Sequence, residues 1–136
     1  MRNRASLFGF SIIVVALLVI LGGCSTDEGA NAGPLPITND SGTKLSGTGS
    51  GREWGYHGWV DVELTLADGW ITEATVTGPD ETPGVGAAAI QRAPAIIKQK
   101  NSVEIDVVAS ASITTEAIRK AGRQAIDEIK AGGAGG

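Results

Sequence analysis

Apolar and polar residues alternate along two neighbouring stretches of the chain, a pattern typical of β-strands with one buried face. The inward positions are Val60, Val62, Leu64 and Leu66 in the first stretch, and Trp70, Thr72, Ala74 and Val76 in the second. The residues between them, Ala-Asp-Gly at 67–69, favour a turn. The pattern therefore predicts a β-hairpin.

The register of this hairpin depends on the length of its turn. A two-residue turn would place Leu64 opposite Glu73 on the apolar face, whereas a three-residue turn keeps that face apolar. We therefore expect the three-residue turn, with Gly69 in the left-handed conformation as a bulge. This register pairs Leu66 with Trp70, Val62 with Ala74 and Val60 with Val76, and it places Glu63 opposite Glu73 on the outer face.

Residues 86–100 form the first of two predicted helices, which Pro94 is expected to break or restart. Residues 102–108 are predicted to form a short strand. The last predicted helix covers residues 115–130, and Thr114 or Thr115 is its expected N-cap. Its apolar stripe consists of Ile118, Ala121, Ala125 and Ile129. The order of these elements predicts an α+β domain, in which a small β-sheet built on the hairpin packs with two helices.

The start of the chain has the layout of a secretory signal. Two arginines precede an apolar run at 8–21, which is short for a membrane span. The run ends in Leu21-Gly22-Gly23-Cys24, which resembles the bacterial lipobox, where Cys24 would be lipidated and become the mature N-terminus. The other interpretation is an uncleaved anchor helix with a chance cysteine. We expect a signal peptide at 1–23, a lipidated flexible linker at 24–46, a domain at 47–130 and a flexible Gly-rich tail at 131–136.

Charge and cysteine content narrow the possible partners. The first 23 residues hold two of the 11 basic residues and none of the 15 acidic ones, so the remainder has a formal charge of −6. This argues against nucleic acid, whose binding needs clustered Lys and Arg, and against electrostatic binding to anionic lipid. The lipid on Cys24 is then the expected membrane contact. With Cys24 lipidated, the chain has no thiol for a disulfide, for catalysis or for a metal.

Four hydroxyl residues crowd the approach to the last predicted helix: Ser110, Ser112, Thr114 and Thr115. One hydroxyl suffices for a cap, so Ser110 and Ser112 are spare. A hydroxyl just before a helix lies near unpaired N–H groups and the positive end of the helix dipole. The cluster therefore predicts a place where a phosphate could be held or bonded.

Two motifs resemble the FMN-binding domain found in small subunits of sodium-pumping quinone reductase and the Rnf complex, and in many bacterial lipoproteins. The family's Glu-Thr-Pro-Gly-Leu/Ile-Gly is matched by Glu81-Thr82-Pro83-Gly84-Val85-Gly86. Its Asp followed by Ser/Thr-Gly-Ala-Thr corresponds to Asp106 and Ala109-Ser110-Ala111-Ser112, and Thr114 and Thr115 follow. The resemblance covers residues 47–130, with its elements in the family's order.

The resemblance implies FMN as the cofactor and a flavin transferase as a partner, with FAD as the FMN donor. Ser112 would be the acceptor of a phosphoester, and Asp106 would belong to the transferase's recognition sequence. The other expected flavin-binding residues are Ser110, Ala111, Thr114, Thr115, Glu81, Thr82 and Gly84. The family's Gly is Ser110 here, which would strain a left-handed turn, and its leading Ser/Thr is Ala109.

The resulting expectation is a lipid-anchored electron carrier at the cell membrane, facing outside the cytoplasm and without a substrate reaction of its own. It would receive electrons from a membrane donor and pass them to an extracytoplasmic acceptor. The alternative is a non-redox binding or scaffold lipoprotein with a degenerate FMN-binding fold. A third interpretation, a hydrolase, would use His57, Asp61 and a serine. Three aromatic residues could stack on the flavin or belong to the core: Trp54, Tyr56 and Trp59.

Overall fold

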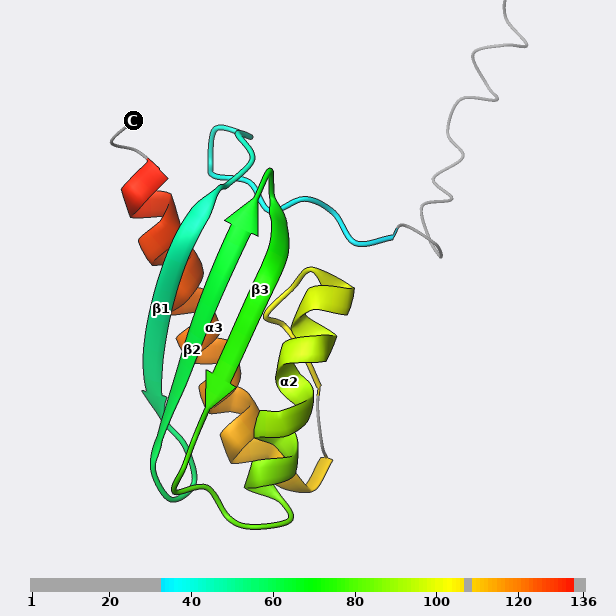
Figure 1. Ribbon diagram of the computed structural model, residues 1–136, viewed down its shortest axis with the longest axis vertical. Coiled ribbons are helices and arrows are strands. Elements are labelled where there is room, and N and C mark those ends of the chain that lie inside the picture. The colour runs from blue at the N-terminus through cyan, green and yellow to red at the C-terminus, as the bar shows by residue number, and fades with distance from the viewer. Residues whose placement is uncertain (1–32, 107–108, 134–136) are drawn as a thin grey trace, which may run out of the picture. The chain divides into compact units, whose positions relative to one another are not determined.

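The computed structural model describes residues 33–106 and 109–133, and its centre is a three-stranded antiparallel sheet (Figure 1). The strands are β1 (Gly47–Trp54), β2 (Trp59–Ala67) and β3 (Trp70–Thr77), in the order β1-β2-β3. The helices are α2 (Gly86–Lys100) and α3 (Ser112–Gly133), and a short 3-10 turn, η1 (Ala109–Ala111), precedes α3. α3 packs on β1 and β2, and α2 packs on β3. The predicted α+β fold is confirmed.

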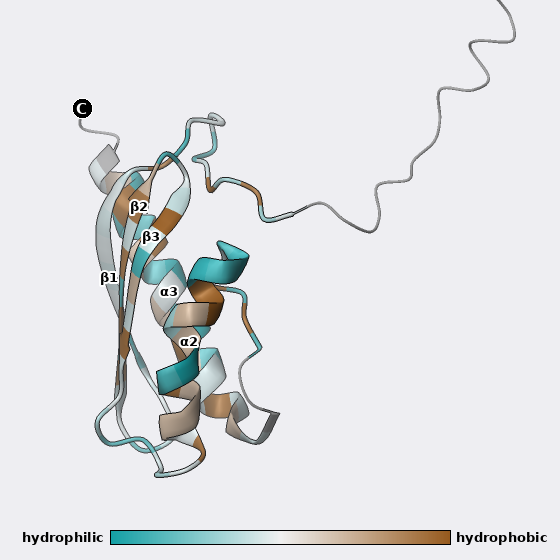
Figure 2. Ribbon diagram, turned by 45° about the vertical axis from the view of Figure 1, so that its right-hand side comes forward, coloured by the Kyte–Doolittle hydropathy of each residue, from teal (hydrophilic) through white to brown (hydrophobic). Residues whose placement is uncertain are grey.

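The core lies between the sheet and the helices. β2 supplies Val60, Val62, Leu64 and Leu66, all nearly or fully buried. α3 supplies the predicted stripe of Ile118, Ala121, Ala125 and Ile129, and α2 adds Ala89, Ala93 and Ile97. Figure 2 shows hydrophobic positions along the strands and on both helices. Because the strand side chains alternate, Glu63 on the other side of β2 is exposed.

The expected hairpin register is wrong, although the hairpin itself is present. The turn has two residues, Asp68 and Gly69, both with positive φ, and Ala67 pairs with Trp70 across it. One extra residue on β3, Thr72, then shifts the pairing. The bulge keeps one face of the hairpin apolar, as the three-residue turn was expected to do. The facing pairs on it are Leu66 with Ile71, Leu64 with Ala74 and Val62 with Val76.

The bulge also changes which side chains of β3 face the core. Ile71 is buried where Trp70 was expected, and Trp70 is exposed. Glu73 pairs with Thr65 and Glu63 pairs with Thr75, so the expected repulsion between two glutamates does not arise.

α2 continues through Pro94 without the expected break. An interior proline costs about 3 kcal/mol in a helix. The burial of Ala89, Ala93 and Ile97 along one face of α2 offsets this cost. The helix ends at Lys100, and its C-cap residue is Asn101, whose φ of 49° is left-handed.

The predicted strand at 102–108 is absent from its described part, residues 102–106. Val103 and Ile105 are buried, yet they pair with no strand among the described residues. The segment is instead tied to α3, because the Arg123 guanidinium donates two hydrogen bonds to the Glu104 carboxylate at 2.5 and 2.7 Å. These bonds lower the pKa of Glu104. Val107 and Val108 lie outside the described residues.

α3 begins at Ser112, so Thr114 and Thr115 are not its N-cap as expected. Both threonines lie within the first turn and are buried. The helix extends to Gly133, into the predicted tail. None of the described helices has the length and apolar character required to cross a bilayer. The predicted signal peptide and Cys24 lie outside the described residues.

The chain between Leu35 and Leu45, assigned to the linker by composition, is hydrogen-bonded to the β2–β3 turn. Ile37 N–H donates to the Gly69 carbonyl at 2.8 Å, and Gly69 N–H donates to the Leu45 carbonyl at 2.7 Å. The buried Asn101 amide donates to the carbonyls of Leu35 and Gly69 and accepts from Ile71 N–H. Figure 1 shows this segment at one end of the sheet and the start of α3 at the other.

Two glycines of β1 allow α3 to lie directly on the strand. A Cβ atom at Gly51 would collide with the Ala121 carbonyl, and one at Gly49 would collide with the Ala125 carbonyl. The outward N–H groups of this edge strand are satisfied by α3, since Ser50 N–H donates to Glu128 at 2.6 Å and Arg52 N–H donates to Gln124 at 3.0 Å. The glycines of this Gly-rich stretch therefore serve packing within a strand.

We predict that Gly51→Ala lowers the free energy of unfolding by about 2 kcal/mol, because the added methyl must push α3 away from β1. Urea unfolding followed by circular dichroism measures this loss. Gly132→Ala is the matched control, since Gly132 is exposed on α3 with no atom near the new methyl, and it should leave stability unchanged or slightly higher. Equal stability of the two variants would contradict the close approach.

Candidate functional site

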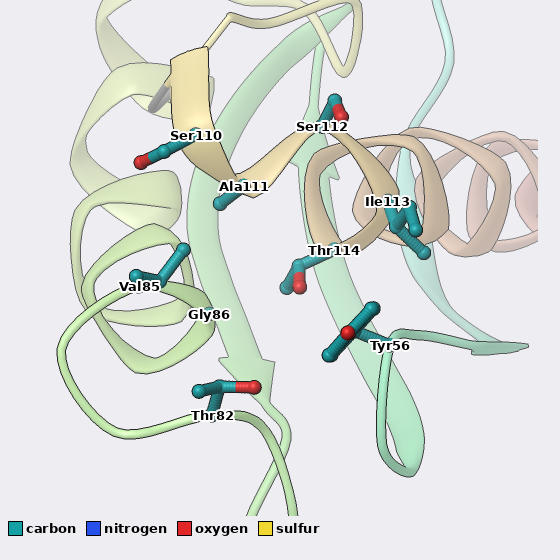
Figure 3. A pocket seen from close by; sticks show the side chains of 9 residues that line it. All are labelled: Tyr56, Thr82, Val85, Gly86, Ser110, Ala111, Ser112, Ile113 and Thr114. Atoms are coloured by element: carbon teal, nitrogen blue, oxygen red, sulfur yellow. The ribbon is translucent and has the colours of Figure 1, made fainter.

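An open pocket of about 310 Å³ lies where the loop before α2 meets the start of α3. Its walls come from three parts of the chain: Tyr56 from the β1–β2 loop; Thr82, Val85 and Gly86 from the loop before α2; and residues 110–114 from η1 and α3. Figure 3 shows Tyr56 and Val85 on opposite sides of the pocket, with Thr114 between them. No charged side chain lines the pocket within the described ranges.

Two helix N-termini meet at this pocket. α2 starts at Gly86 and α3 at Ser112, and both residues line it. Val85, the residue before α2, makes no side-chain capping bond, and neither helix has an acidic residue in its first turn. The first N–H groups of a helix lack partners within the helix and carry partial positive charge. The pocket therefore combines an uncharged wall with two positive helix ends.

Glu81 connects the segments that form the pocket, and it is only 4% exposed. Its Oε2 accepts a hydrogen bond from the Thr114 hydroxyl at 2.5 Å. Its Oε1 accepts from the backbone N–H groups of Tyr56 at 2.8 Å and His57 at 3.3 Å. Asp80, the adjacent acid in the loop, is exposed, whereas Glu81 is buried.

Glycines on either side make room for this carboxylate. A Cβ at Gly55 would collide with Glu81 Oε1, and one at Gly86 would lie 2.5 Å from Oε2 and 3.1 Å from Thr114 Oγ1. The last glycine of the Glu81–Gly86 motif therefore allows the start of α2 to approach both side chains. Gly84 has a φ of +86°, which explains glycine at that position by the turn alone.

The structure brings together most of the residues expected to bind the flavin. Ser110, Ala111, Ser112, Thr114 and Thr82 line the pocket. Ser112 lies at the opposite edge of the pocket from Thr82, and its side chain is exposed (Figure 3). The remaining expected residues, Glu81, Gly84, Asp106 and Thr115, are not among the lining residues.

These four residues have other surroundings. Glu81 lies behind Thr114, and Gly84 is in the exposed turn. Asp106 is 96% exposed at its side chain and lies 3.7 Å from the guanidinium of Arg119. Thr115 is buried, and its hydroxyl has no hydrogen-bond partner among the described residues. Thr82 Oγ1 is also buried without a protein partner, at the wall of the pocket.

A second hollow of about 250 Å³ shares Ser112 and Ile113 with the first. It is also lined by Trp54, whose ring meets Trp59 edge-on at 5.1 Å between centroids. Trp54, Trp59 and Tyr56 are all about half exposed, so none of these three aromatic residues belongs to the core. Tyr56 alone of the three lines the first pocket.

Sequence reasoning did not single out Val85, Gly86 and Ile113 as individual lining residues, and it left Tyr56 undecided among three aromatics. Val85 and Gly86 belong to the Glu81–Gly86 motif, but the spacing of the motif does not indicate where each side chain points. The sequence gives no signal for Ile113, because an apolar residue in an amphipathic helix is normally buried. In the structure Ile113 is 53% exposed.

Thr114 and Thr115 provide a matched test of the Glu81 hydrogen bond. We predict that Thr114→Val lowers the free energy of unfolding by about 1–3 kcal/mol, because the buried carboxylate loses a donor. Thr115→Val has the same change of atoms one residue later, yet it removes a buried hydroxyl that has no protein partner. It should leave stability unchanged or raised in the same urea titration. A larger loss from Thr115→Val than from Thr114→Val would contradict this assignment.

Comparison with known families identifies the domain. The sequence profile of the FMN-binding domain family matches residues 55–127, more than half of the chain. The match runs from the β1–β2 loop into α3 and so includes every residue that lines the first pocket. The orphan hydroxyl of Thr82, the two helix N-termini and the facing Tyr56 and Val85 suit a phosphorylated, planar aromatic cofactor. The chain therefore belongs to the FMN-binding domain family, and FMN is its cofactor.

Proposed function

We propose that this protein is an exported, lipid-anchored electron carrier that holds FMN through a phosphoester to Ser112. The observation that carries the proposal is the place of Ser112. It is the first residue of α3, its side chain is exposed, and it lines a pocket at which two helices begin. A nucleophilic hydroxyl that a transferase can reach thus lies beside a region suited to a phosphate.

The phosphate end of FMN would be held by the helix N-termini. Both helices begin at the pocket, and the positive ends of their dipoles favour the negative charge of a phosphate. In the transfer reaction, the Ser112 oxygen would bond to the FMN phosphorus of FAD. The pyrophosphate bond would break, AMP would leave, and the serine proton would be released to the transferase or to solvent.

The ring end of FMN would lie between Tyr56 and Val85. These side chains face each other across the pocket (Figure 3), and an aromatic face opposite an aliphatic one suits a flat ring. Thr82 Oγ1 offers a hydroxyl with no protein partner at this wall. Bound FMN would supply the electron-transfer chemistry, while the chain orients the ring and leaves one side of it open.

The anchoring part of the proposal rests on the sequence before the domain. Residues 1–23 have the layout of a signal peptide and end at Cys24, the residue that a lipobox requires. A diacyl anchor at Cys24 would hold the carrier at the membrane outside the cytoplasm, within reach of a membrane electron donor and an extracytoplasmic acceptor.

The rival interpretations find less support in the described residues. Ser110, which replaces the family's glycine, lies in the η1 turn and has no positive φ, so the expected strain is absent. This removes the main reason to regard the domain as degenerate. For a hydrolase, Asp61 pairs with Arg52 and the His57 ring lies edge-on to Tyr56, and no hydrogen bond within the described residues joins them to Ser112.

The full chain, co-expressed with an active flavin transferase, should remain fluorescent after denaturing electrophoresis, because a phosphoester survives unfolding. Trypsin cleaves after Lys100 and Arg119, so the acceptor lies in peptide 101–119. The mass of this peptide should rise by that of FMN minus water, and fragmentation should place the gain on Ser112.

Ser112→Ala should abolish both signals, and Ser110→Ala is the matched control that removes the neighbouring exposed hydroxyl and should keep them. A yellow protein that loses its flavin on denaturation would refute the phosphoester and retain FMN binding. A colourless protein, made beside a control domain that the same transferase modifies, would refute the electron carrier and favour the degenerate scaffold.

A further inference from the structure

Glu81 is a buried carboxylate that is not among the residues lining the FMN pocket. All of its hydrogen-bond partners are donors: the Thr114 hydroxyl and the N–H groups of Tyr56 and His57. Within residues 33–106 and 109–133, no Lys or Arg forms an ion pair with it. A buried group with only donor partners acts as an acceptor at both oxygens, which is the role of an ionised carboxylate.

This carboxylate lies one hydrogen bond behind the wall of the pocket. Thr114 lines the pocket, and Glu81 Oε2 is 2.5 Å from its hydroxyl oxygen. The lining residues themselves are uncharged. The charged residues of the second hollow are Glu53, Glu116 and Lys120, which are of both signs and border open solvent. Because a partly desolvated wall screens a charge less than water does, Glu81 adds a negative potential at a ligand beside Thr114, opposite in sign to that of the two helix N-termini.

Glu81 also determines whether the Thr114 hydroxyl can donate or accept a hydrogen bond on the pocket side. A threonine hydroxyl has one proton, and this proton is donated to Glu81. Only the lone pairs of the oxygen remain available on the pocket side. A ligand there meets an acceptor with a negative charge behind it, rather than a donor.

We propose that Glu81 lowers the reduction potential of the FMN held in this pocket. Two-electron reduction with uptake of one proton adds one net negative charge to the flavin. The Glu81 carboxylate opposes this charge, and the Thr114 oxygen, whose proton is committed, cannot donate to it. Glu81 acts through Thr114 and does not touch the ring, so it is a positioning residue. The inference rests on the proposed function only in that FMN occupies the pocket.

Glu81→Gln isolates the charge with little change in shape. The amide oxygen can still accept from Tyr56 and His57, and the amide N–H₂ can donate to Thr114. The variant therefore retains every hydrogen bond, with the one to Thr114 reversed. Loss of the charge and release of the Thr114 proton toward the pocket both favour the reduced flavin.

The measurement is a spectroelectrochemical titration of the flavin-loaded full chain in detergent. At the potential where the wild-type flavin is half reduced, Glu81→Gln should show an excess of reduced over oxidised flavin of roughly fivefold or more. A single charge within about 15 Å of the flavin predicts this ratio at an effective dielectric of about 20. Glu81→Met is a second neutral variant of similar length and should shift the equilibrium in the same direction.

Two charge controls separate this effect from structural damage. Asp80→Asn removes the same charge from the adjacent, exposed residue and should leave the potential unchanged. Glu81→Asp disturbs the hydrogen bonds by shortening the side chain but keeps the charge, so its potential should stay near that of the wild type. A merely structural role would make Glu81→Asp at least as disturbing as Glu81→Gln.

An unchanged or lowered potential in the neutral variants would overturn the proposal, and so would equal shifts in Glu81→Asp and Glu81→Gln. Loss of flavin from both neutral variants while the wild type retains it would also overturn it, since Glu81 would then be required for binding. Absence of flavin from the wild type is a different outcome, because it refutes the proposed function itself.

Discussion

The close packing of α3 on β1 is the constraint on which the remaining structure depends. Gly49 and Gly51 have no side chain, so the backbone of α3 lies against the strand where any Cβ would collide with it. Small residues on the helix, Ala121 and Ala125, complete this contact. Once α3 is fixed on the sheet, its first turn can lie only at the end of the sheet where β1 passes into β2. The position of Ser112 follows from that contact.

A second constraint gives the site its shape. Glu81 joins the loop before α2, the β1–β2 loop and the first turn of α3 through three hydrogen bonds. A buried carboxylate without an ion pair costs free energy unless its oxygens are fully hydrogen-bonded. The same arrangement that satisfies Glu81 therefore also fixes the walls of the FMN pocket.

The two ends of the domain are specialised differently. At one end the Leu35–Leu45 segment and Asn101 fasten the incoming chain to the β2–β3 turn. At the other end lie the pocket and most of the exposed large apolar side chains: Trp54, Tyr56, Trp59, Val85 and Ile113. Exposed apolar groups cost free energy in water, and their gathering around one site is typical of a functional surface.

The sequence by itself determined the β2–β3 hairpin, the two helices and the family. Alternation fixed the hairpin, the apolar stripe fixed α3, and two spaced motifs indicated an FMN-binding domain, because these signals are local. The tertiary structure alone decided the Thr72 bulge, the exposure of Trp70, the continuation of α2 through Pro94 and the absence of a strand at 102–106. It also decided that Glu81 lies behind Thr114 rather than in solvent. Each of these depends on contacts between segments distant in sequence, whose energies outweigh local preference and leave no trace in the spacing of residues.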